Sequence, residues 1–387
     1  MILLKTIGFP RMHKEINERR DFLPSFFDML KMEKAQIFLE EGYGLALGYT
    51  KEDYLKSNKK ILFVTKRECY GKDIVVVLRS PEFEEIEDMK EGSTLLSMLH
   101  YATRATRVEK LKEKNIYAVS MDSIRNDFLE RMVVNYEGTS GNGVNVAFTE
   151  LVKSYDNICI QERKPIIVSI MGMGRVGLTA ARIAGKYGNN KVNENMLQEK
   201  TRGVIVKLLP RNITDDKKQM IKILKKTDIL IDATTRDDAT KYVISNELLG
   251  HLKEHSIILD LTADPYLIDV NNSLQIKAVE GIPHGTLDKN VIYPGDSEYS
   301  AIPNCLESHN QRTVVSCNAW PGVNPEACMD LYGKQLIYIV QNLIGYSNQD
   351  FDLYNSDYFN RAIYRGTIEC FEKSLDTYGD EMVNEVM

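Results

Sequence analysis

Three glycines near the middle of the chain have the spacing with the clearest chemical meaning. Gly172, Gly174 and Gly177 form the pattern Gly-x-Gly-x-x-Gly, with Arg175 and Val176 between the last two. In a dinucleotide-binding turn, the first glycine allows the tight bend, the second lets the backbone approach a pyrophosphate, and the third lets helix and strand pack closely. N–H groups at the start of the following helix bind the phosphates. These five residues are therefore predicted to bind a dinucleotide; the alternative is a structural turn without a ligand.

The segments on both sides of the glycines have the patterns that such a turn requires. Residues 166–171 are apolar and mostly β-branched, which predicts a strand buried on both faces. Residues 178–187 are small and apolar, which is typical of a helix packed on a sheet. A strand before the motif and a helix after it favour dinucleotide binding over a chance match.

The end of the next predicted strand bears on the choice of cofactor. Folds that prefer NAD place an Asp or Glu there, where it binds the ribose hydroxyl groups. Here residues 207–210 contain no acid and are followed by Arg211, which is suited to pair with the 2′-phosphate of NADP. NADP is therefore favoured over NAD. NAD stays open, because Asp215 and Asp216 follow and an apparent insertion at residues 188–202 makes the register ambiguous.

Four polar residues are predicted to follow strands at their carboxyl ends, where parallel α/β sheets bind ligands. They are Arg19, Arg79, His100 and Asp264. Two arginines can hold a carboxylate through bidentate hydrogen bonds. A histidine that titrates near neutrality can act as general acid and base. An aspartate can orient a polar intermediate or stabilise developing positive charge.

Each of these residues also has a purely structural interpretation. An arginine after a strand is most often a surface residue in a salt bridge, and a single histidine is most often structural. His284, in the sequence Gly-Ile-Pro-His-Gly-Thr, has local features similar to those of His100. Asp264 precedes Pro265 and is also suited to begin a turn.

Strands and helices alternate along most of the chain, which predicts parallel α/β domains. Before the glycine motif, strands are expected at residues 2–7, 73–78, 93–99 and 116–121, and helices at 21–31, 107–114 and 122–132. Residues 139–144 contain two glycines among polar residues, which predicts a linker. Beyond the motif, strands are expected at 203–209, 228–233, 256–262, 275–279 and 313–318, and amphipathic helices at 329–344 and 358–375.

Composition and charge restrict the class of protein. The 387 residues are enough for two or three domains with large cores. A net charge of −6 argues against nucleic acid as the main partner. No apolar run approaches the roughly 20 residues of a membrane helix, and the N-terminus lacks the layout of a signal peptide. The six cysteines are scattered without a Cys-x-x-Cys pair, so we expect a reduced cytoplasmic protein with no metal site and no membrane partner.

A set of short motifs, in the same order, resembles the alanine dehydrogenase and pyridine nucleotide transhydrogenase family. The motifs are Gly8-Phe-Pro with Lys14, Arg19 and Pro24; Glu41-Gly-Tyr-Gly; the stretch from Gly48 to Tyr54; Arg79-Ser-Pro; Leu99-His100; Asp260-Leu-Thr-Ala-Asp264; and Cys317-Asn318-Ala-Trp-Pro321-Gly322. Saccharopine dehydrogenases and carboxyethyl-ornithine synthases look like relatives with the same architecture. At one position this chain departs from the family, because Arg79 stands where the family has a lysine.

The resemblance implies an α/β protein of two Rossmann-like doubly wound domains with a cleft between them. Residues 1–145 and 322–387 would form a discontinuous substrate-binding and catalytic domain. Residues 146–321 would form the dinucleotide-binding domain. The active site would lie in the cleft, and the chain would form a homo-oligomer.

The resemblance also implies a role for each candidate residue. Arg19 would bind the substrate carboxylate, and Arg79 would join it in substrate binding. His100 would be the acid/base group, and Asp264 would face the reacting carbon. Asn318 would lie near the nicotinamide of the cofactor.

The expected function is that of an NAD(P)-dependent amino acid dehydrogenase acting on a C–N bond, with an amino acid and a 2-oxo acid as small-molecule substrates. Arginine cannot exchange protons as lysine does, so Arg79 argues against true alanine dehydrogenase activity with ammonia. Together with the long segment 281–314, it favours an amino acid as the amine, as in saccharopine or opine chemistry. A catalytically silent NAD(P)H-binding sensor is the alternative. A transhydrogenase subunit is disfavoured because the chain has no membrane segment.

Overall fold

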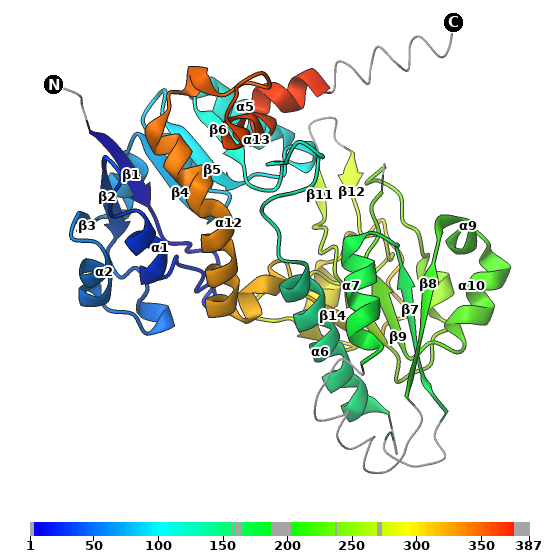
Figure 1. The fold of residues 1–387 in the computed structure, drawn as a ribbon. Coiled ribbons are helices and arrows are strands. Elements are labelled where there is room, and N and C mark those ends of the chain that lie inside the picture. Colours follow the sequence, from blue (N-terminus) through cyan, green and yellow to red (C-terminus); the bar gives the residue numbers. More distant parts are fainter. Residues whose placement is uncertain are drawn as a thin grey trace, which may run out of the picture. The chain divides into compact units, whose positions relative to one another are not determined.

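A computed structural model describes residues 4–155, 158, 164–186, 203–236, 238–268 and 273–374. The chain divides into two compact units, coloured along the sequence in Figure 1. Unit 1 comprises Met1–Lys14, Glu18–Val134 and Pro325–Met387, and unit 2 comprises Glu15–Asn17 and Asn135–Asn324. The expected insertion at 188–202 lies outside the described residues.

Unit 1 is built on a six-stranded sheet in the order β3-β2-β1-β4-β5-β6, in which every neighbouring pair is parallel. The strands are β1 (Lys5–Phe9), β2 (Ala35–Glu40), β3 (Ile61–Val64), β4 (Ile74–Arg79), β5 (Thr94–Met98) and β6 (Tyr117–Ser120). The strand order reverses between β1 and β4, which is the arrangement of a doubly wound fold.

The helices of unit 1 come from both parts of the chain that form it. They are α1 (Pro24–Met29), α2 (Lys51–Ser57), α3 (Lys66–Tyr70), α4 (Phe83–Glu87), α5 (Ala105–Glu113), α12 (Pro325–Gly345) and α13 (Tyr358–Arg365). The central strand β4 is buried on both faces because its side chains alternate between two cores. Ile74, Val76 and Leu78 belong to the core that contains α1 and α12. Val75 and Val77 belong to the core that contains α5.

Unit 2 is built on a second six-stranded sheet, in the order β13-β14-β10-β9-β7-β8. Its parallel strands are β7 (Ile166–Met171), β8 (Val204–Leu209), β9 (Ile229–Asp232), β10 (Ile257–Asp260) and β14 (Thr313–Ser316). The edge strand β13 (Val291–Ile292) is antiparallel to β14, and β11 (Leu267–Ile268) and β12 (Leu274–Gln275) form a separate two-stranded antiparallel sheet. Strand order reverses between β7 and β9, so this sheet is also doubly wound.

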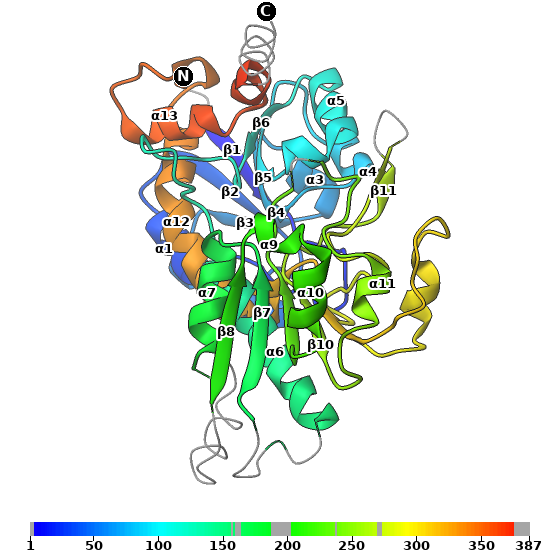
Figure 2. The ribbon, with the colours of Figure 1, turned by 90° about the vertical axis from the view of Figure 1, so that its right-hand side faces the viewer.

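Helices cover both faces of the unit 2 sheet (Figure 2). They are α6 (Tyr136–Ser154), α7 (Arg175–Ala184), α9 (Arg211–Thr214), α10 (Lys217–Leu224) and α11 (Asn246–Leu249). In β10, Ile257 and Leu259 pack with α6 and α7, whereas Ile258 packs with α10 and α11. The alternation follows from the two-residue period of a strand, and it explains the continuous apolar runs in the sequence. The α/β doubly wound fold class is thereby confirmed for both units.

The linker expected at residues 139–144 is wrong, because these residues lie inside α6. A Cβ atom at Gly143 would lie 2.7 Å from Cδ2 of Leu261 and 3.1 Å from Cδ1 of Leu259. The glycine therefore serves close packing of α6 against the end of β10, and does not break the helix. The main part of compact unit 2 spans Asn135–Asn324, and the domain bounds 146–321 stay a prediction.

Two further expectations on secondary structure are wrong. Residues 122–132 form a turn and not a helix, with an antiparallel bridge between Arg125 and Arg131. The Asn126 Oδ1 atom accepts hydrogen bonds from the N–H groups of Phe128 (3.0 Å) and Glu130 (2.8 Å). Such local bonds compete with a helix. Residues 276–279, expected to belong to a strand, follow β12 as irregular chain.

No helix among the described residues is long and apolar enough to cross a membrane. Their cysteines, at positions 69, 305, 317, 328 and 370, form no disulfide with one another. Across the same residues, no group of three or more His, Cys, Asp or Glu side chains is arranged to hold a metal ion.

Candidate functional site

The glycine motif forms the turn between β7 and α7, and each glycine meets a different steric requirement. Gly172 has φ of +94°, and a Cβ atom there would lie 2.2 Å from the carbonyl oxygen of Ala233. A Cβ atom at Gly177 would lie 2.2 Å from the carbonyl oxygen of Gly172. Gly174, the N-cap of α7, has no atom within 4 Å of such a Cβ. The first and third glycines are thus required by the fold, whereas the second leaves open space beside the helix start.

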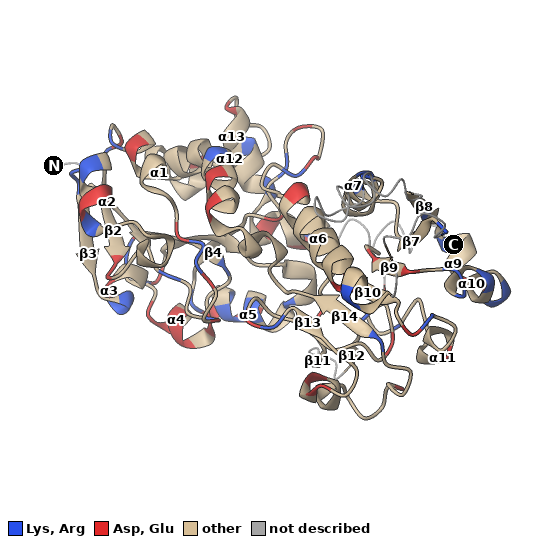
Figure 3. Ribbon diagram, turned by 90° about the horizontal axis from the view of Figure 1, so that it is seen from below, with Lys and Arg blue, Asp and Glu red and all other residues tan. Residues whose placement is uncertain are grey.

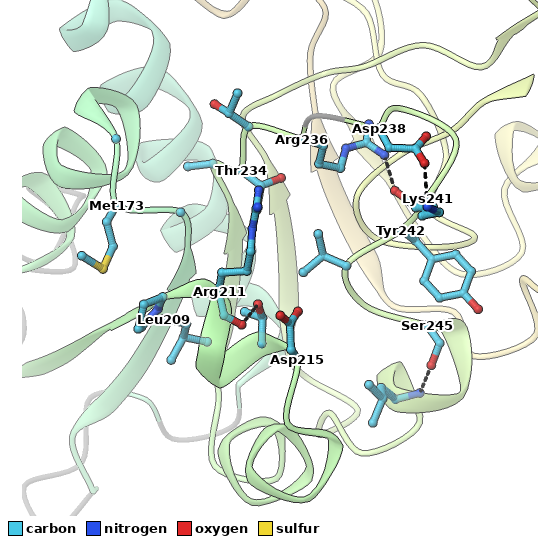
Figure 4. Close-up of a pocket in the computed structure, with 18 of the residues that line it drawn as sticks. Met173, Leu209, Arg211, Asp215, Thr234, Arg236, Asp238, Lys241, Tyr242 and Ser245 are labelled. Carbon is cyan, nitrogen blue, oxygen red and sulfur yellow. Dashed lines mark hydrogen bonds and ion pairs between the residues drawn. The ribbon is translucent and has the colours of Figure 1, made fainter. Parts of the chain in front are cut away.

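A pocket of about 740 Å³ opens in front of this turn (Figure 4). It lies at the carboxyl ends of β7, β8 and β9, where the strand order reverses and doubly wound folds bind dinucleotides. The lining residues come from the glycine turn, the end of β8 with α9 and the start of α10, and the segment from β9 to α11. They are Gly172, Met173, Gly174, Leu209, Pro210, Arg211, Thr214, Asp215, Lys217, Ala233, Thr234, Thr235, Arg236, Asp238, Lys241, Tyr242, Val243, Ser245 and Leu248.

The predicted cofactor residues differ in their relation to this pocket. Gly172, Gly174 and Arg211 line it, whereas Arg175, Val176, Gly177 and Asn318 do not. Gly177 acts through packing, as its contact with Gly172 shows. The sequence interpretation missed the wall formed by Thr234, Thr235 and Arg236. These residues directly follow the predicted strand 228–233, so the strand-end rule applied to Asp264 would have found them.

Four basic side chains, those of Arg211, Lys217, Arg236 and Lys241, line the pocket. Lys217 begins α10, a helix on which basic residues recur (Figure 3). Lys217 Nζ pairs with Glu247 at 2.8 Å, and Lys241 Nζ pairs with Asp238 at 2.9 Å. The pocket therefore offers several cations to an anionic ligand, and the carboxylates nearby limit the excess of positive charge.

Asp264 lies four residues beyond β10 and is held by Arg236. The Arg236 Nη2 atom lies 2.7 Å from Asp264 Oδ2 and 2.6 Å from the carbonyl oxygen of Ile276. The Arg236 side chain is 8% exposed, whereas that of Asp264 is 35% exposed. Because Arg236 also lines the pocket, it links the predicted catalytic aspartate to the pocket.

Two carboxylates are buried next to each other at the ends of β9 and β10. Asp232 and Asp260 are register partners on these strands and are almost completely buried. Asp260 accepts hydrogen bonds from Lys277 Nζ at 2.7 Å and Ser316 Oγ at 2.9 Å. Asp232 accepts from the N–H and hydroxyl groups of Thr234, at 3.0 and 2.8 Å. Burial, followed by the charge of Asp260, raises the pKa of Asp232 to about 6.

The raised pKa of Asp232 predicts that the stability of the fold decreases as pH rises through a defined range. Between the ordinary Asp pKa near 3.9 and the folded value, the folded chain holds a proton that the unfolded chain has lost, so stability falls as pH rises. Between pH 4.5 and 7.5, we expect the free energy of unfolding of the wild type to fall by about 2 kcal/mol relative to that of Asp232→Asn. Urea unfolding followed by the fluorescence of Trp320, which packs in the unit 2 core, measures this difference. Equal pH dependence of the two proteins would contradict it.

In unit 1, His100 lies two residues beyond β5 and faces a carboxylate that is largely but not fully buried. Its Nδ1 atom lies 3.4 Å from Asp122 Oδ2, and its side chain is 55% exposed. Asp122 Oδ1 also accepts hydrogen bonds from the hydroxyl of Ser120 (2.6 Å) and the N–H of Leu99 (3.1 Å). Burial acts to raise the pKa of Asp122, but the hydrogen bond and charge of His100, with the bond from Ser120, hold it well below its usual value. Asp122 was missed as a site residue in the sequence, where it was the first residue of the helix expected at 122–132.

The two predicted substrate-binding arginines have different surroundings. Arg79 is the last residue of β4, and its Nη1 atom lies 3.3 Å from Glu18 Oε2. The Glu18 side chain is fully buried, and Arg20 also donates to it, at 2.8 Å through Nε. Burial acts to raise the pKa of Glu18, but the charges of Arg20 and Arg79 outweigh it and lower the value. Arg19 is exposed in the loop between β1 and α1.

Two doubly wound α/β units, one of them with a glycine turn opening into a pocket at its switch point, define a dinucleotide-binding protein of Rossmann type. The chain belongs to the alanine dehydrogenase/PNT family. The family model described as "Alanine dehydrogenase/PNT, N-terminal domain" matches residues 10–134, and that for the C-terminal domain matches residues 159–266. The resemblance stated from the sequence motifs is thereby confirmed.

Curated relatives and solved structures agree with this family. The alanine dehydrogenase of Methanococcus maripaludis is 22% identical over 269 residues, which cover 67% of this chain and 72% of that protein. The alanine dehydrogenase of Bacillus subtilis is 23% identical over 274 residues, which cover 67% and 70%. A solved L-alanine dehydrogenase matches with a TM-score of 0.65 at 18% identity over 94% of both chains. A transhydrogenase from Sinorhizobium meliloti matches with a TM-score of 0.58 at 15% identity over 88% of this chain and 94% of that one. The structural matches support the fold.

Proposed function

We propose that this protein is an NAD(P)-dependent oxidoreductase that acts on the C–N bond of an amino acid. The observation that carries the proposal is the glycine turn at the switch point of unit 2, which opens into a pocket of about 740 Å³ in a chain of the alanine dehydrogenase/PNT family. A bound nicotinamide would supply the hydride acceptor or donor. Unit 2 would hold this cofactor, and unit 1 would supply the groups that bind substrate and move protons.

His100 is the proposed acid/base residue. Its contact with Asp122 occupies Nδ1 and leaves Nε2 as the nitrogen that exchanges a proton with the substrate amine. The largely buried carboxylate of Asp122 would stabilise the imidazolium form and orient the ring. This arrangement supports proton transfer better than an isolated histidine on a loop would.

Arg19 and Arg79 are the proposed carboxylate-binding residues, with Asp264 facing the reacting carbon. Arginine stays protonated, so Arg79 would bind and polarise without exchanging protons. Its contact with Glu18, which Arg20 also holds, fixes the guanidinium at the end of β4. Asp264, held by Arg236, would stabilise the positive charge that develops on the carbon–nitrogen unit.

We further propose that the amine is an amino acid rather than ammonia. Arg79 in place of the family's lysine supports this choice. The long segment 281–314 supports an amino acid as the amine less strongly than its length suggested. It includes the edge strand β13, and its residues Tyr299 and Ile302 are buried in a core of unit 2. Part of this segment therefore completes the fold.

Loss of absorbance at 340 nm tests the proposed activity directly. NADPH and NADH would each be combined with pyruvate, glyoxylate or 2-oxoglutarate, and with ammonium, lysine or ornithine as amine. Turnover that requires lysine or ornithine is the expected result, whereas turnover with ammonium alone would contradict the choice of amine. Absence of turnover across the panel, although a cofactor binds, would contradict the proposed activity and favour a sensor.

We propose NADP as the preferred cofactor, supported by Arg211 in the pocket wall after β8. Arg211→Ala is expected to weaken NADPH binding about 10- to 100-fold and NADH binding less than threefold, because a guanidinium–phosphate hydrogen bond is charge-assisted. Titration of both cofactors measures the effect. Lys222→Ala, which removes an exposed cation of α10 outside the pocket, is the matched control. Equal losses for both cofactors would contradict the assignment.

A further inference from the structure

Asn318 lies where the nicotinamide half of a dinucleotide would extend. It follows β14 by two residues, and the register Asp232–Asp260–Ser316 aligns the carboxyl ends of β9, β10 and β14. Arg211 follows β8 on one side of the switch point, and the pocket that it lines extends to the end of β9 on the other side. A dinucleotide crosses the switch point between the two halves of the sheet. With the adenosine half on the β8 side, the nicotinamide half would lie over the ends of β9, β10 and β14.

The amide group of Asn318 has a defined orientation. Its Nδ2 atom donates to Glu15 Oε1 at 2.9 Å. An ionised carboxylate only accepts hydrogen bonds, so the amide nitrogen and not its oxygen must face Glu15. Asn318 Oδ1 therefore points away from Glu15. This oxygen is buried and accepts no hydrogen bond from the described part of the chain, which is costly unless a ligand supplies a donor.

Glu15 is itself firmly placed on unit 2. Its Oε2 atom accepts from the N–H of Leu287 at 2.6 Å. The N–H groups of Ile16 and Asn17 donate to the carboxylate of Asp288, at 3.0 and 2.8 Å. Residues 15–17 accordingly belong to unit 2, although the residues on either side of them belong to unit 1. The hydrogen bond from Leu287 thus holds the carboxylate that orients Asn318, and two bonds to Asp288 hold the backbone that follows it.

We infer that Glu15 is a positioning residue that directs the Asn318 amide oxygen toward the carboxamide N–H of a bound nicotinamide. The inference rests on the proposed function, because it takes the ligand to be a nicotinamide dinucleotide. A primary carboxamide supplies the N–H donor that the buried oxygen lacks, whereas an adenosine group bound on the β8 side does not reach it. Glu15 acts through Asn318 and does not touch the cofactor.

The inference predicts how the protein distinguishes two cofactors that differ in one group. In the reduced 3-acetylpyridine analogue a methyl group replaces the amide nitrogen, so it has no N–H to donate. The wild type is expected to bind the natural reduced cofactor at least tenfold more tightly than the analogue. Glu15→Ala and Asn318→Ala should reduce this ratio below threefold. Glu15→Gln keeps an acceptor for Asn318 Nδ2 and should retain most of the wild-type affinity ratio.

Equilibrium titration by quenching of Trp320 fluorescence measures these affinities without turnover. The adenosine fragment 2′,5′-ADP is the control, and its affinity should be the same in all variants. An unchanged ratio in Glu15→Ala would overturn the inference, and so would an equal loss of fragment and dinucleotide affinity, which indicates general disruption. Failure of the wild type to bind either the dinucleotide or the fragment would overturn the proposed function itself.

Discussion

His100→Ala is expected to lower kcat by roughly 10²–10⁴-fold, the range lost when a positioned acid/base group is removed. The reason is the geometry at the end of β5, where Nδ1 of the ring faces the carboxylate of Asp122 at 3.4 Å and the side chain is more than half exposed. Steady-state and single-turnover rates, followed at 340 nm with the best substrates of the panel, measure the effect. Cofactor affinity should stay within about threefold, because His100 belongs to unit 1.

Two further variants sharpen this test. His309→Ala removes an exposed histidine whose Nδ1 pairs with Glu307 at 3.1 Å, and it should leave kcat unchanged. Asp122→Asn keeps an oxygen for the N–H of Leu99 and removes the negative charge behind His100, so it should lower kcat and shift the pH profile of the reaction. A loss below threefold in His100→Ala, with chemistry shown to be rate-limiting, would remove His100 from the role.

Alanine substitutions in the glycine turn are expected to separate fold stability from cofactor binding. Gly172→Ala and Gly177→Ala would each place a Cβ atom 2.2 Å from a carbonyl oxygen, and Gly172 also has a positive φ. We expect each to destabilise unit 2 by about 2–4 kcal/mol. Gly174→Ala has open space in the protein and should leave stability unchanged. It should nevertheless weaken NADPH binding about 10- to 100-fold, because the methyl group occupies the space that a pyrophosphate needs.

Unfolding monitored by Trp320 and titration with NADPH give the two readouts. Gly295→Ala is the matched control for a positive φ without a clash, since Gly295 has φ of +86° and no atom within 4 Å of a Cβ. Gly295→Ala should lower the free energy of unfolding by about 1 kcal/mol and leave NADPH binding unchanged. Tight NADPH binding by Gly174→Ala would place the pyrophosphate elsewhere and contradict the proposed site.

The contacts between site residues that the sequence interpretation missed are long-range contacts. Arg236 meets Asp264 after 28 residues, Asp122 meets His100 after 22, and Glu18 meets Arg79 after 61. Each pair joins the ends of different strands or loops, and no local spacing connects them. Local sequence also does not reveal that residues 15–17 belong to unit 2, because their placement there depends on hydrogen bonds with Leu287 and Asp288.

The sequence by itself determined the features that arise from local backbone geometry and periodicity. A β-branched apolar run, three glycines at fixed spacing and a small-residue helix specify the β7–α7 turn, since only glycine tolerates the contacts found at Gly172 and Gly177. The alternation of strands and helices and the ordered motifs specified the fold class and the family in the same way.

The tertiary structure alone decided which polar groups meet and which glycines serve packing. Gly143 looked like part of a linker, but close contact with β10 places it inside α6. Asp232 looked like an ordinary strand residue, but burial beside Asp260 raises its pKa. In both cases the deciding neighbour lies about 30 to 120 residues away in the sequence and becomes adjacent only when the sheet of unit 2 forms. Packing and burial depend on that proximity, and local sequence patterns do not encode it.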